Sequence, residues 1–201
     1  MEGVRHIEKT NTVDNTTART NLLTILESVT LPRISPGRIV KTGKNTGQVV
    51  RNRGDRIGTD GRTCTFGFGR TRTKGWTEFA ANRRWPEVYK ACCEYGRQIV
   101  PTGTFFNCIT LNQNVKAKKH TDSLNVGDSV IVGIGNYEGG KLRVYDPSTD
   151  VFTAYDIKDK PLQFNGNTHA HETEEFTGVR WSLIFYCQAR RDPLVWPSTG
   201  V

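Results

Sequence analysis

A histidine and a carboxylate lie two residues apart in the second half of the chain, at His120 and Asp122. On an extended segment, residues i and i+2 point to the same face, so both side chains can bind one metal ion. A histidine from a distant strand would complete three ligands and leave three adjacent coordination positions open. That arrangement is used by non-haem Fe(II) oxygenases, which bind a cosubstrate and O2 side by side. Because H-x-D tripeptides are common by chance, the prediction depends on residues further along.

Two histidines further along, His169 and His171, compete to be the third ligand. They are themselves two residues apart, so the alternation of a strand cannot choose between them. The histidine that does not bind the metal has two alternative interpretations. It is either a second-sphere or substrate-pocket group, or an ordinary loop histidine that faces solvent.

Arg180 follows His171 by nine residues and opens an otherwise apolar predicted strand over 179–187. On such a strand Arg180 and Ser182 face one way, while Trp181 and Leu183 face the other. A guanidinium that faces inward requires a buried anion, and its forked donors fit a carboxylate. A dicarboxylate cosubstrate would supply that anion. The alternative is an internal ion pair with an aspartate or glutamate.

Together these residues resemble the Fe(II)/2-oxoglutarate-dependent dioxygenases, whose fold is a double-stranded β-helix, or jelly roll. The finer pattern resembles the TET/JBP branch and its viral and algal relatives, which oxidise methyl groups of pyrimidine bases in DNA. Three pieces carry the resemblance: H-x-D-x-x-N at 120–125, G-N-Y-E-G-G at 135–140, and H-x8-R-x-S-L-x-F-Y at 171–186. It covers about residues 64–190. The spacing of histidine and arginine in the last piece selects His171 over His169.

The resemblance implies that His120, Asp122 and His171 bind Fe(II), and that O2 is the oxidant. It also implies that Arg180 binds the distal carboxylate of the cosubstrate 2-oxoglutarate. Ser182 would assist this arginine.

The same resemblance implies a substrate and two further contacts. Asn112 and Asn125 would hydrogen-bond the cosubstrate or a base. The substrate would be DNA, with hydroxylation of a methyl group of 5-methylcytosine or thymine. The alternatives are the same chemistry on a peptidyl (prolyl-type) or small-molecule substrate, and a jelly-roll binding module without enzymatic activity.

The charge of the chain favours a polyanionic partner. It has 28 Lys+Arg and 20 Asp+Glu, a net charge of +8, and residues 33–97 hold 15 of the basic and 5 of the acidic side chains. Such a segment predicts either a solvated face or a footprint on a phosphate backbone. Within it, Trp76, Arg83, Arg84 and Trp85 are the predicted phosphate contacts and base-stacking platform.

The remaining composition sets the expected compartment. The chain has five cysteines, an odd number without any C-x-x-C pair, which predicts reduced thiols in the cytoplasm or nucleus. No apolar run approaches the roughly 20 residues of a membrane-spanning helix, so no membrane association is expected. Residues 1–6 have no apolar stretch behind their charges, so no signal peptide is expected.

These residues require a scaffold of short strands, and the chain predicts an α+β domain of that kind. Helical spacing predicts helices over 17–29 and 85–98, and period-two patterns predict strands over 105–111, 129–134, 141–145, 151–155, 161–164 and 179–187. We expect an N-terminal extension with a short helix (1–32, frayed over 1–16), a dioxygenase domain (33–190) and a tail (191–201). The domain would comprise a basic first part (33–97), with loops or an edge hairpin over 33–63, and a jelly-roll core at about 104–188.

Overall fold

The computed structural model describes residues 3–7, 15–34, 38–39, 49–50, 56–57, 61–71 and 75–188. The predicted tail at 191–201 and most of the predicted loops in 33–63 lie outside these residues. The helices are α1 (Asn15–Glu27), α2 (Ala80–Arg84) and α3 (Pro86–Ile99). The strands are β1 (Arg5–His6), β2 (Arg38–Ile39), β3 (Val49–Val50), β4 (Arg56–Ile57), β5 (Arg62–Thr71), β6 (Gly75–Glu78), β7 (Cys108–Gln113), β8 (Lys116–Ala117), β9 (Ser129–Ile134), β10 (Tyr137–Gly139), β11 (Leu142–Tyr145), β12 (Phe152–Tyr155), β13 (Leu162–Phe164), β14 (His171–Thr173), β15 (Phe176–Gly178) and β16 (Trp181–Tyr186).

The larger sheet has the antiparallel strand order β1-β13-β9-β16-β7-β5-β6, so its last long strand, β16, lies between β9 and β7. A smaller sheet, β12-β11-β14, comes from the intervening chain. The β8 segment continues toward this sheet, because residues 120 and 171 form a β-bridge. Strands that alternate between two sheets in this way build a double-stranded β-helix, which confirms the predicted jelly-roll fold.

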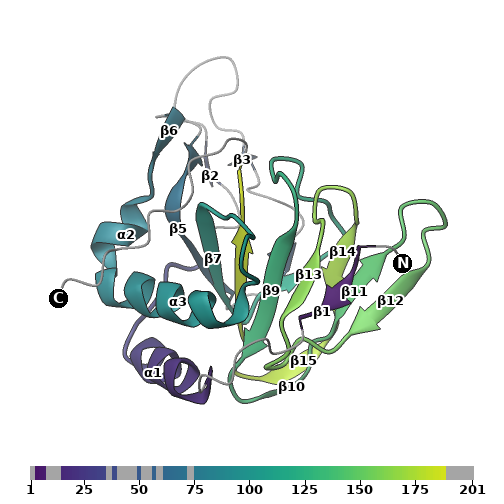
Figure 1. Cartoon of the computed structure of the whole chain (residues 1–201). Coiled ribbons are helices and arrows are strands. Elements are labelled where there is room, and N and C mark those ends of the chain that lie inside the picture. Colours follow the sequence, from purple (N-terminus) through teal and green to yellow (C-terminus); the bar gives the residue numbers. More distant parts are fainter. Residues whose placement is uncertain are drawn as a thin grey trace.

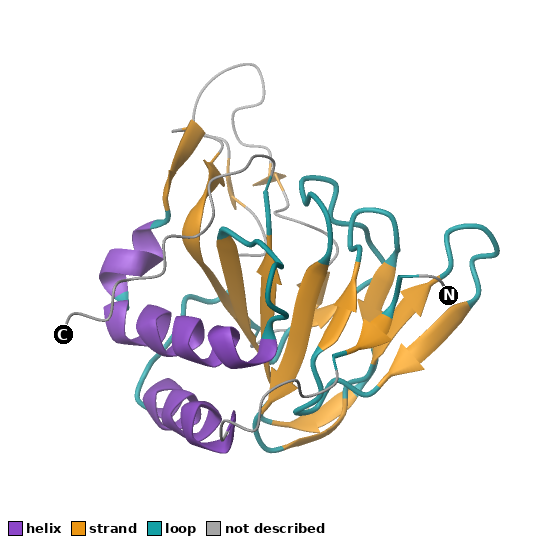
Figure 2. Ribbon diagram, in the orientation of Figure 1, coloured by secondary structure: helices purple, strands orange, loops and turns teal. Residues whose placement is uncertain are grey.

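Helices α1 and α3 cover one face of the larger sheet (Figures 1 and 2). Pro86 starts α3 at a position where a missing backbone N–H costs nothing. The helix then buries an apolar face that includes Val88, Cys92 and Tyr95. Gly96 lets the helix approach the sheet closely, because a Cβ there would lie 2.5 Å from the ring of Phe185 on β16. This packing leaves the opposite face of the sheet free to form the inside of the barrel.

A second, smaller apolar cluster lies between the two sheets. It comprises Ile131, Leu142, Val144, Ile157, Leu162 and Phe164, all of which are buried. The period-two alternation that predicted strands puts these side chains inward from both sheets. The cluster is a separate apolar core from the one beneath the helices.

Most predicted elements are present, with shifted bounds. Strand 129–134 is found at the predicted residues, and the helix at 85–98 is found at 86–99. The strand predicted from 105 begins only at 108, and the strand predicted from 179 begins at 181. The prediction of a frayed 1–16 was wrong at residues 5–6, which pair with β13. The prediction missed β5, β6, α2, β8, β10, β14 and β15, which are mostly short and rich in Gly, Thr or charged residues.

None of the five cysteines forms a disulfide, and four of them are buried. Among the described residues, no helix is long and apolar enough to span a bilayer.

Candidate active site

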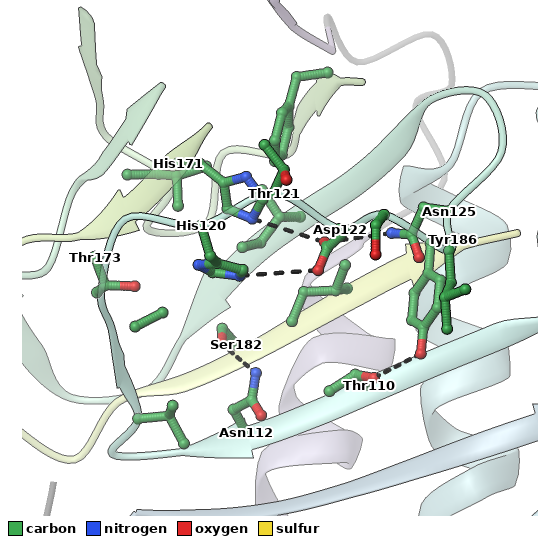
Figure 3. A pocket seen from close by; sticks show the side chains of 18 of the residues that line it. Thr110, Asn112, His120, Thr121, Asp122, Asn125, His171, Thr173, Ser182 and Tyr186 are labelled. Atoms are coloured by element: carbon green, nitrogen blue, oxygen red, sulfur yellow. Dashed lines mark hydrogen bonds and ion pairs between the residues drawn. The ribbon is translucent and has the colours of Figure 1, made fainter. Parts of the chain in front are cut away.

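The side chains of His120, Asp122 and His171 converge in a cavity between the two sheets (Figure 3). Their potential ligand atoms all lie within 4.8 Å of one another. The Nε2 atom of His120 is 3.8 Å from Asp122 Oδ1, and that of His171 is 3.7 Å from Asp122 Oδ2. The two histidines lie opposite each other because their backbones exchange two hydrogen bonds, of 3.1 and 2.9 Å. The fold thus joins residues 51 positions apart into one three-ligand site.

Backbone carbonyls fix the orientation of both imidazoles. The Nδ1 atom of His120 is 2.6 Å from the carbonyl oxygen of Lys118, and that of His171 is 3.0 Å from the carbonyl oxygen of His169. A carbonyl can only accept, so each Nδ1 carries the proton. In a neutral imidazole this leaves the Nε2 lone pair unprotonated, and both lone pairs then face Asp122. Metal-binding histidines are held in this way by a hydrogen bond on the other ring nitrogen.

His169 takes a different position from His171. Its Nδ1 lies 2.9 Å from Thr168 Oγ1 and 3.2 Å from the carbonyl oxygen of Asn165, so its ring belongs to a local turn. The ring does not line the cavity. The structure therefore brings the side chain of His171 to Asp122, while His169 contributes only its backbone carbonyl.

Asp122 is held by its neighbours on both sides. Its N–H donates to the carbonyl oxygen of Gly166 at 2.8 Å. The amide of Asn125 donates to Asp122 Oδ2 at 3.3 Å and to Ser129 Oγ at 3.4 Å. A Cβ at Gly166 would lie 3.2 Å from the same carboxylate oxygen and 3.5 Å from His171 Cε1. Gly166 thus gives the ligands room, a role that the sequence does not reveal because it depends on a contact between distant segments.

The cavity has a volume of about 380 Å³, within the usual range for small-molecule sites. Figure 3 shows two polar ends on either side of the ligand cluster. Asn112, Thr173 and Ser182 lie at one end, which we call the Ser182 end. At the other end are Asn125, Tyr186 and Thr110, whose hydroxyl is 3.1 Å from the Tyr186 hydroxyl. Apolar walls complete the cavity, among them Val115, Leu124, Ile131, Leu142, Phe164 and Ile184.

Arg180 is buried immediately beyond the Ser182 end and is not itself part of the cavity wall. Only 1% of the residue is exposed, and its guanidinium lies 5.5 Å from the ring centre of Tyr137 and 5.4 Å from that of Phe176. Its Nε and Nη2 have no hydrogen-bond partner among the described residues, which also offer it no ion pair. Burial lowers the pKa of Arg180. The internal ion pair considered as an alternative is thus not present in the described structure.

Tyr137 adds a second unpaired donor at this place. Its buried hydroxyl lies beside the Arg180 guanidinium without forming a hydrogen bond of normal geometry, and burial raises the pKa of Tyr137, which the guanidinium partly offsets. A Cβ at Gly133 would collide with that hydroxyl, and Gly133 pairs directly with Ser182 across β9 and β16. The Tyr137 hydroxyl therefore lies beside Ser182. Buried donors without acceptors are rare in proteins, and a bound carboxylate would satisfy those of Tyr137 and Arg180 together.

Sequence reasoning missed Tyr137 as a site residue. The only signal was its place in the G-N-Y-E-G-G segment, which supported the resemblance without indicating a chemical role.

The predicted DNA-binding residues lie outside the cavity. Trp76 is 42% exposed and stacks on Phe68 of the adjacent strand at a ring distance of 6.3 Å. Arg83 and Arg84 end α2, and the guanidinium of Arg84 lies 4.6 Å from the ring centre of Trp85. The structure thus groups these side chains along β6 and α2, apart from the metal ligands.

No protein family and no curated protein matches the sequence. Several solved structures resemble it. A Pseudomonas putida prolyl-4-hydroxylase has a TM-score of 0.52 at 11% identity, with 94% of each chain covered. OsALKBH1 has a TM-score of 0.50 at 14% identity, covering 92% of this chain and 98% of that one. NgTET1 in complex with 5mC DNA has a TM-score of 0.45 at 10% identity, covering 88% and 91%.

At these identities the first two structures show the fold alone, a double-stranded β-helix, and the TET branch is not singled out. The chain thus combines this fold with an H-x-D…H candidate metal triad.

Proposed function

We propose that this protein is an Fe(II)- and 2-oxoglutarate-dependent dioxygenase that hydroxylates its substrate. The observation that carries the proposal is the pair of carbonyl-held imidazoles, whose Nε2 atoms face one carboxylate in a cavity. His120, Asp122 and His171 would hold Fe(II) and leave adjacent positions for a 2-oxo acid and O2. The metal and cosubstrate supply the oxidising chemistry, while the protein binds, orients and excludes water.

The Ser182 end would bind the far carboxylate of 2-oxoglutarate. Ser182 lines the cavity there, and the unpaired donors of Arg180 and Tyr137 lie directly behind it. A carboxylate only accepts hydrogen bonds, so it complements this group of donors. The neutralisation of a buried guanidinium gives a physical reason for selecting a dicarboxylate over a monocarboxylate.

The apolar walls would keep water from the reacting groups. Phe164 meets the His171 ring edge-on, with 5.0 Å between ring centres, which limits rotation of that imidazole. Leu142 and Ile184 also line the cavity. A dry, fixed arrangement of ligands strengthens their electrostatic interactions with a bound metal.

For the substrate, we propose a methyl group of a pyrimidine base in DNA, 5-methylcytosine or thymine. The excess of basic side chains in residues 33–97 supports a polyanion, and the exposed Trp76 with Arg83 and Arg84 supports a contact surface for it. A base in a duplex would have to be flipped out to reach the cavity. Asn125, Tyr186 and Thr110 at the end opposite Ser182 would offer polar contacts to such a base. A peptidyl or small-molecule substrate is the alternative.

Binding of the metal and cosubstrate is tested first, without oxygen. Wild-type protein with Fe(II) and 2-oxoglutarate is expected to show the weak visible charge-transfer band of a chelated 2-oxo acid. His120→Ala should lose the band, whereas His6→Ala, which changes an exposed histidine of β1, should keep it. Absence of the band in wild-type protein would contradict the proposed activity.

Nucleoside mass spectrometry then tests the substrate. Methylated and unmethylated DNA are incubated with protein, Fe(II), 2-oxoglutarate and O2, and hydroxymethylated nucleosides are expected. Formation of succinate with a prolyl peptide but not with DNA would favour the alternative.

Charge reversal tests the proposed DNA surface. Replacing Arg83 and Arg84 with Glu should weaken DNA binding and lower its salt dependence, because fewer phosphate contacts release fewer counterions. Lys160→Glu, an exposed charge reversal elsewhere, is the control. Unchanged binding in the double variant would show that α2 does not contact DNA.

A further inference from the structure

We propose that Thr63 is a positioning residue for the cosubstrate, acting through Asn112 on the hydroxyl of Ser182. This inference rests on the proposed function, because it concerns how the Ser182 end would bind the far carboxylate of 2-oxoglutarate. It assigns a role to β5, a strand that contributes no residue to the cavity wall.

Three neighbouring strands place these side chains in one row. Thr63 on β5 pairs with Asn112 on β7, which pairs with Ser182 on β16. Directly paired residues of an antiparallel sheet project to the same face, here the face that lines the cavity. The hydroxyl of Thr63 donates to Asn112 Oδ1 at 2.7 Å, and Asn112 Nδ2 donates to Ser182 Oγ at 3.5 Å.

The row has a direction that ends in the cavity. Because Asn112 receives the Thr63 proton on its oxygen, its NH2 group is turned toward Ser182. The Ser182 oxygen then acts as an acceptor within the row, which leaves its own O–H to donate elsewhere. Ser182 lines the cavity and is itself almost fully buried, at 3% exposure, so the cavity is where a carboxylate would meet this proton. Each hydrogen bond in such a chain polarises the next one.

The same place holds the other donors for the carboxylate. The Tyr137 hydroxyl reaches over Gly133, which pairs with Ser182, and Arg180 lies two residues before Ser182 with two unpaired nitrogens. The Thr63 row would therefore supply one of three converging donors. Its loss should weaken binding only of ligands that carry the distal carboxylate.

A second row provides a matched control. Thr65 lies two residues along β5 on the same face, and its hydroxyl is 3.1 Å from that of Thr110, which in turn contacts Tyr186. This row leads to the opposite end of the cavity. Thr65→Val removes the same kind of group from the same strand and has the same effect on strand propensity.

The experiment measures binding by calorimetry with full-length, Mn(II)-loaded protein, without turnover. The probes are 2-oxoglutarate and 2-oxobutyrate, which has the same chelating group but no distal carboxylate. Thr63→Val should bind 2-oxoglutarate about three- to tenfold more weakly than wild type, as expected for the loss of one neutral hydrogen bond. Its affinity for 2-oxobutyrate should equal that of wild type. Thr63→Ser should restore the affinity, Thr65→Val should leave it unchanged, and the Mn(II) affinity should be equal in all variants.

Two outcomes would overturn the inference, and they are distinguishable from failure of the proposed function. If wild type binds 2-oxoglutarate in a metal-dependent way but Thr63→Val binds it equally well, the positioning role is refuted and the function stands. If Thr63→Val loses affinity for both probes equally, the threonine has only a structural role. If wild type fails to bind 2-oxoglutarate with Mn(II) present, the proposed function and the inference fall together.

Discussion

Arg180 should make the ligand-free protein less stable than an apolar residue would in its place. The guanidinium is 1% exposed, and two of its nitrogens have no partner among the described residues. Each buried unpaired donor costs about 1–3 kcal/mol. The contacts with the rings of Tyr137 and Phe176 offset part of this cost, by about 0.5–2 kcal/mol each. Without ligand, Arg180→Met should therefore raise the free energy of unfolding by about 2 kcal/mol, consistent with replacements of buried charges.

Binding of 2-oxoglutarate should make wild type more stable than Arg180→Met. A free-energy difference of about 2 kcal/mol corresponds to about 4–8 °C in melting temperature for a chain of this size. With Mn(II) and 2-oxoglutarate at a hundred times its Kd, wild type should gain about 2.7 kcal/mol through mass action. Arg180→Met should gain much less from 2-oxoglutarate, because the guanidinium that would pair with the distal carboxylate is missing and only the chelating end of the ligand still binds. The assay is thermal and urea unfolding of both proteins with Mn(II), with and without 2-oxoglutarate.

A paired arginine supplies the control. Arg143 donates to Glu174 Oε1 at 2.8 Å and to Glu172 Oε1 at 3.3 Å on the exposed side of the smaller sheet. Arg143→Met should lower stability slightly and leave the response to 2-oxoglutarate intact. The reasoning fails if Arg180→Met unfolds more easily than wild type without ligand, because the guanidinium must then have an internal partner. It also fails if 2-oxoglutarate stabilises the variant as much as it stabilises wild type.

Three further predictions concern the metal site, the thiols and a surface carboxylate. Gly166→Ala should weaken Mn(II) binding, measured by calorimetry, about 10- to 100-fold with little change in melting temperature, because the added Cβ would displace the Asp122 carboxylate. An Mn(II) affinity equal to that of wild type would show that the ligands can shift freely. Burial raises the pKa of three thiols to about 12, so that only about one in 10⁴ of each is a thiolate at pH 8; they are Cys64, Cys93 and Cys108. In native protein at pH 8, Cys187 should therefore react with a thiol reagent well before these three. Fast labelling of more than one cysteine would contradict this. The hydrogen bond from Lys160 lowers the pKa of Asp156, so this carboxyl stabilises the fold above about pH 4 and ceases to do so as the pH falls. Asp156→Asn should therefore be less stable than wild type by about 0.5 kcal/mol or less at pH 7, measured by urea unfolding, and the difference should shrink as the pH falls below about 4. A difference that does not change with pH would have another origin.

The candidate site was predictable to the extent that it depends on spacing. His120 and Asp122 share a face because of the alternation of an extended chain, and Arg180 and Ser182 do so for the same reason. The spacing from His171 to Arg180 selected the same histidine that the structure brings to Asp122. Tyr137 and Gly166 were not predictable as site residues, because their roles depend on contacts with segments distant in the sequence.

The helices and strands were likewise predictable only where the pattern that forms them is local. The helix at 86–99 and the strand at 129–134 carry a strong apolar period over many residues, so local sequence was sufficient to find them. The β5 strand, by contrast, has the sequence R-T-C-T-F-G-F-G-R-T, in which polar residues alternate with buried ones and glycines replace two inward side chains. It forms because β7 pairs with it along six residues, a condition that the sequence does not display locally.

The sequence alone determined which chemical groups are present and which neighbours on a strand act together. It supplied two imidazoles, a carboxylate and an arginine at spacings that fit a metal and a dicarboxylate, and it placed the basic charge in the first half of the chain. The tertiary structure decided which groups distant in the chain meet. It held both imidazoles by backbone carbonyls, left the Arg180 guanidinium unpaired beside the Tyr137 hydroxyl, and joined Thr63 to Ser182 through Asn112. The physical reason is that alternation along a strand is a local property, whereas strand order and register arise from packing of the whole chain.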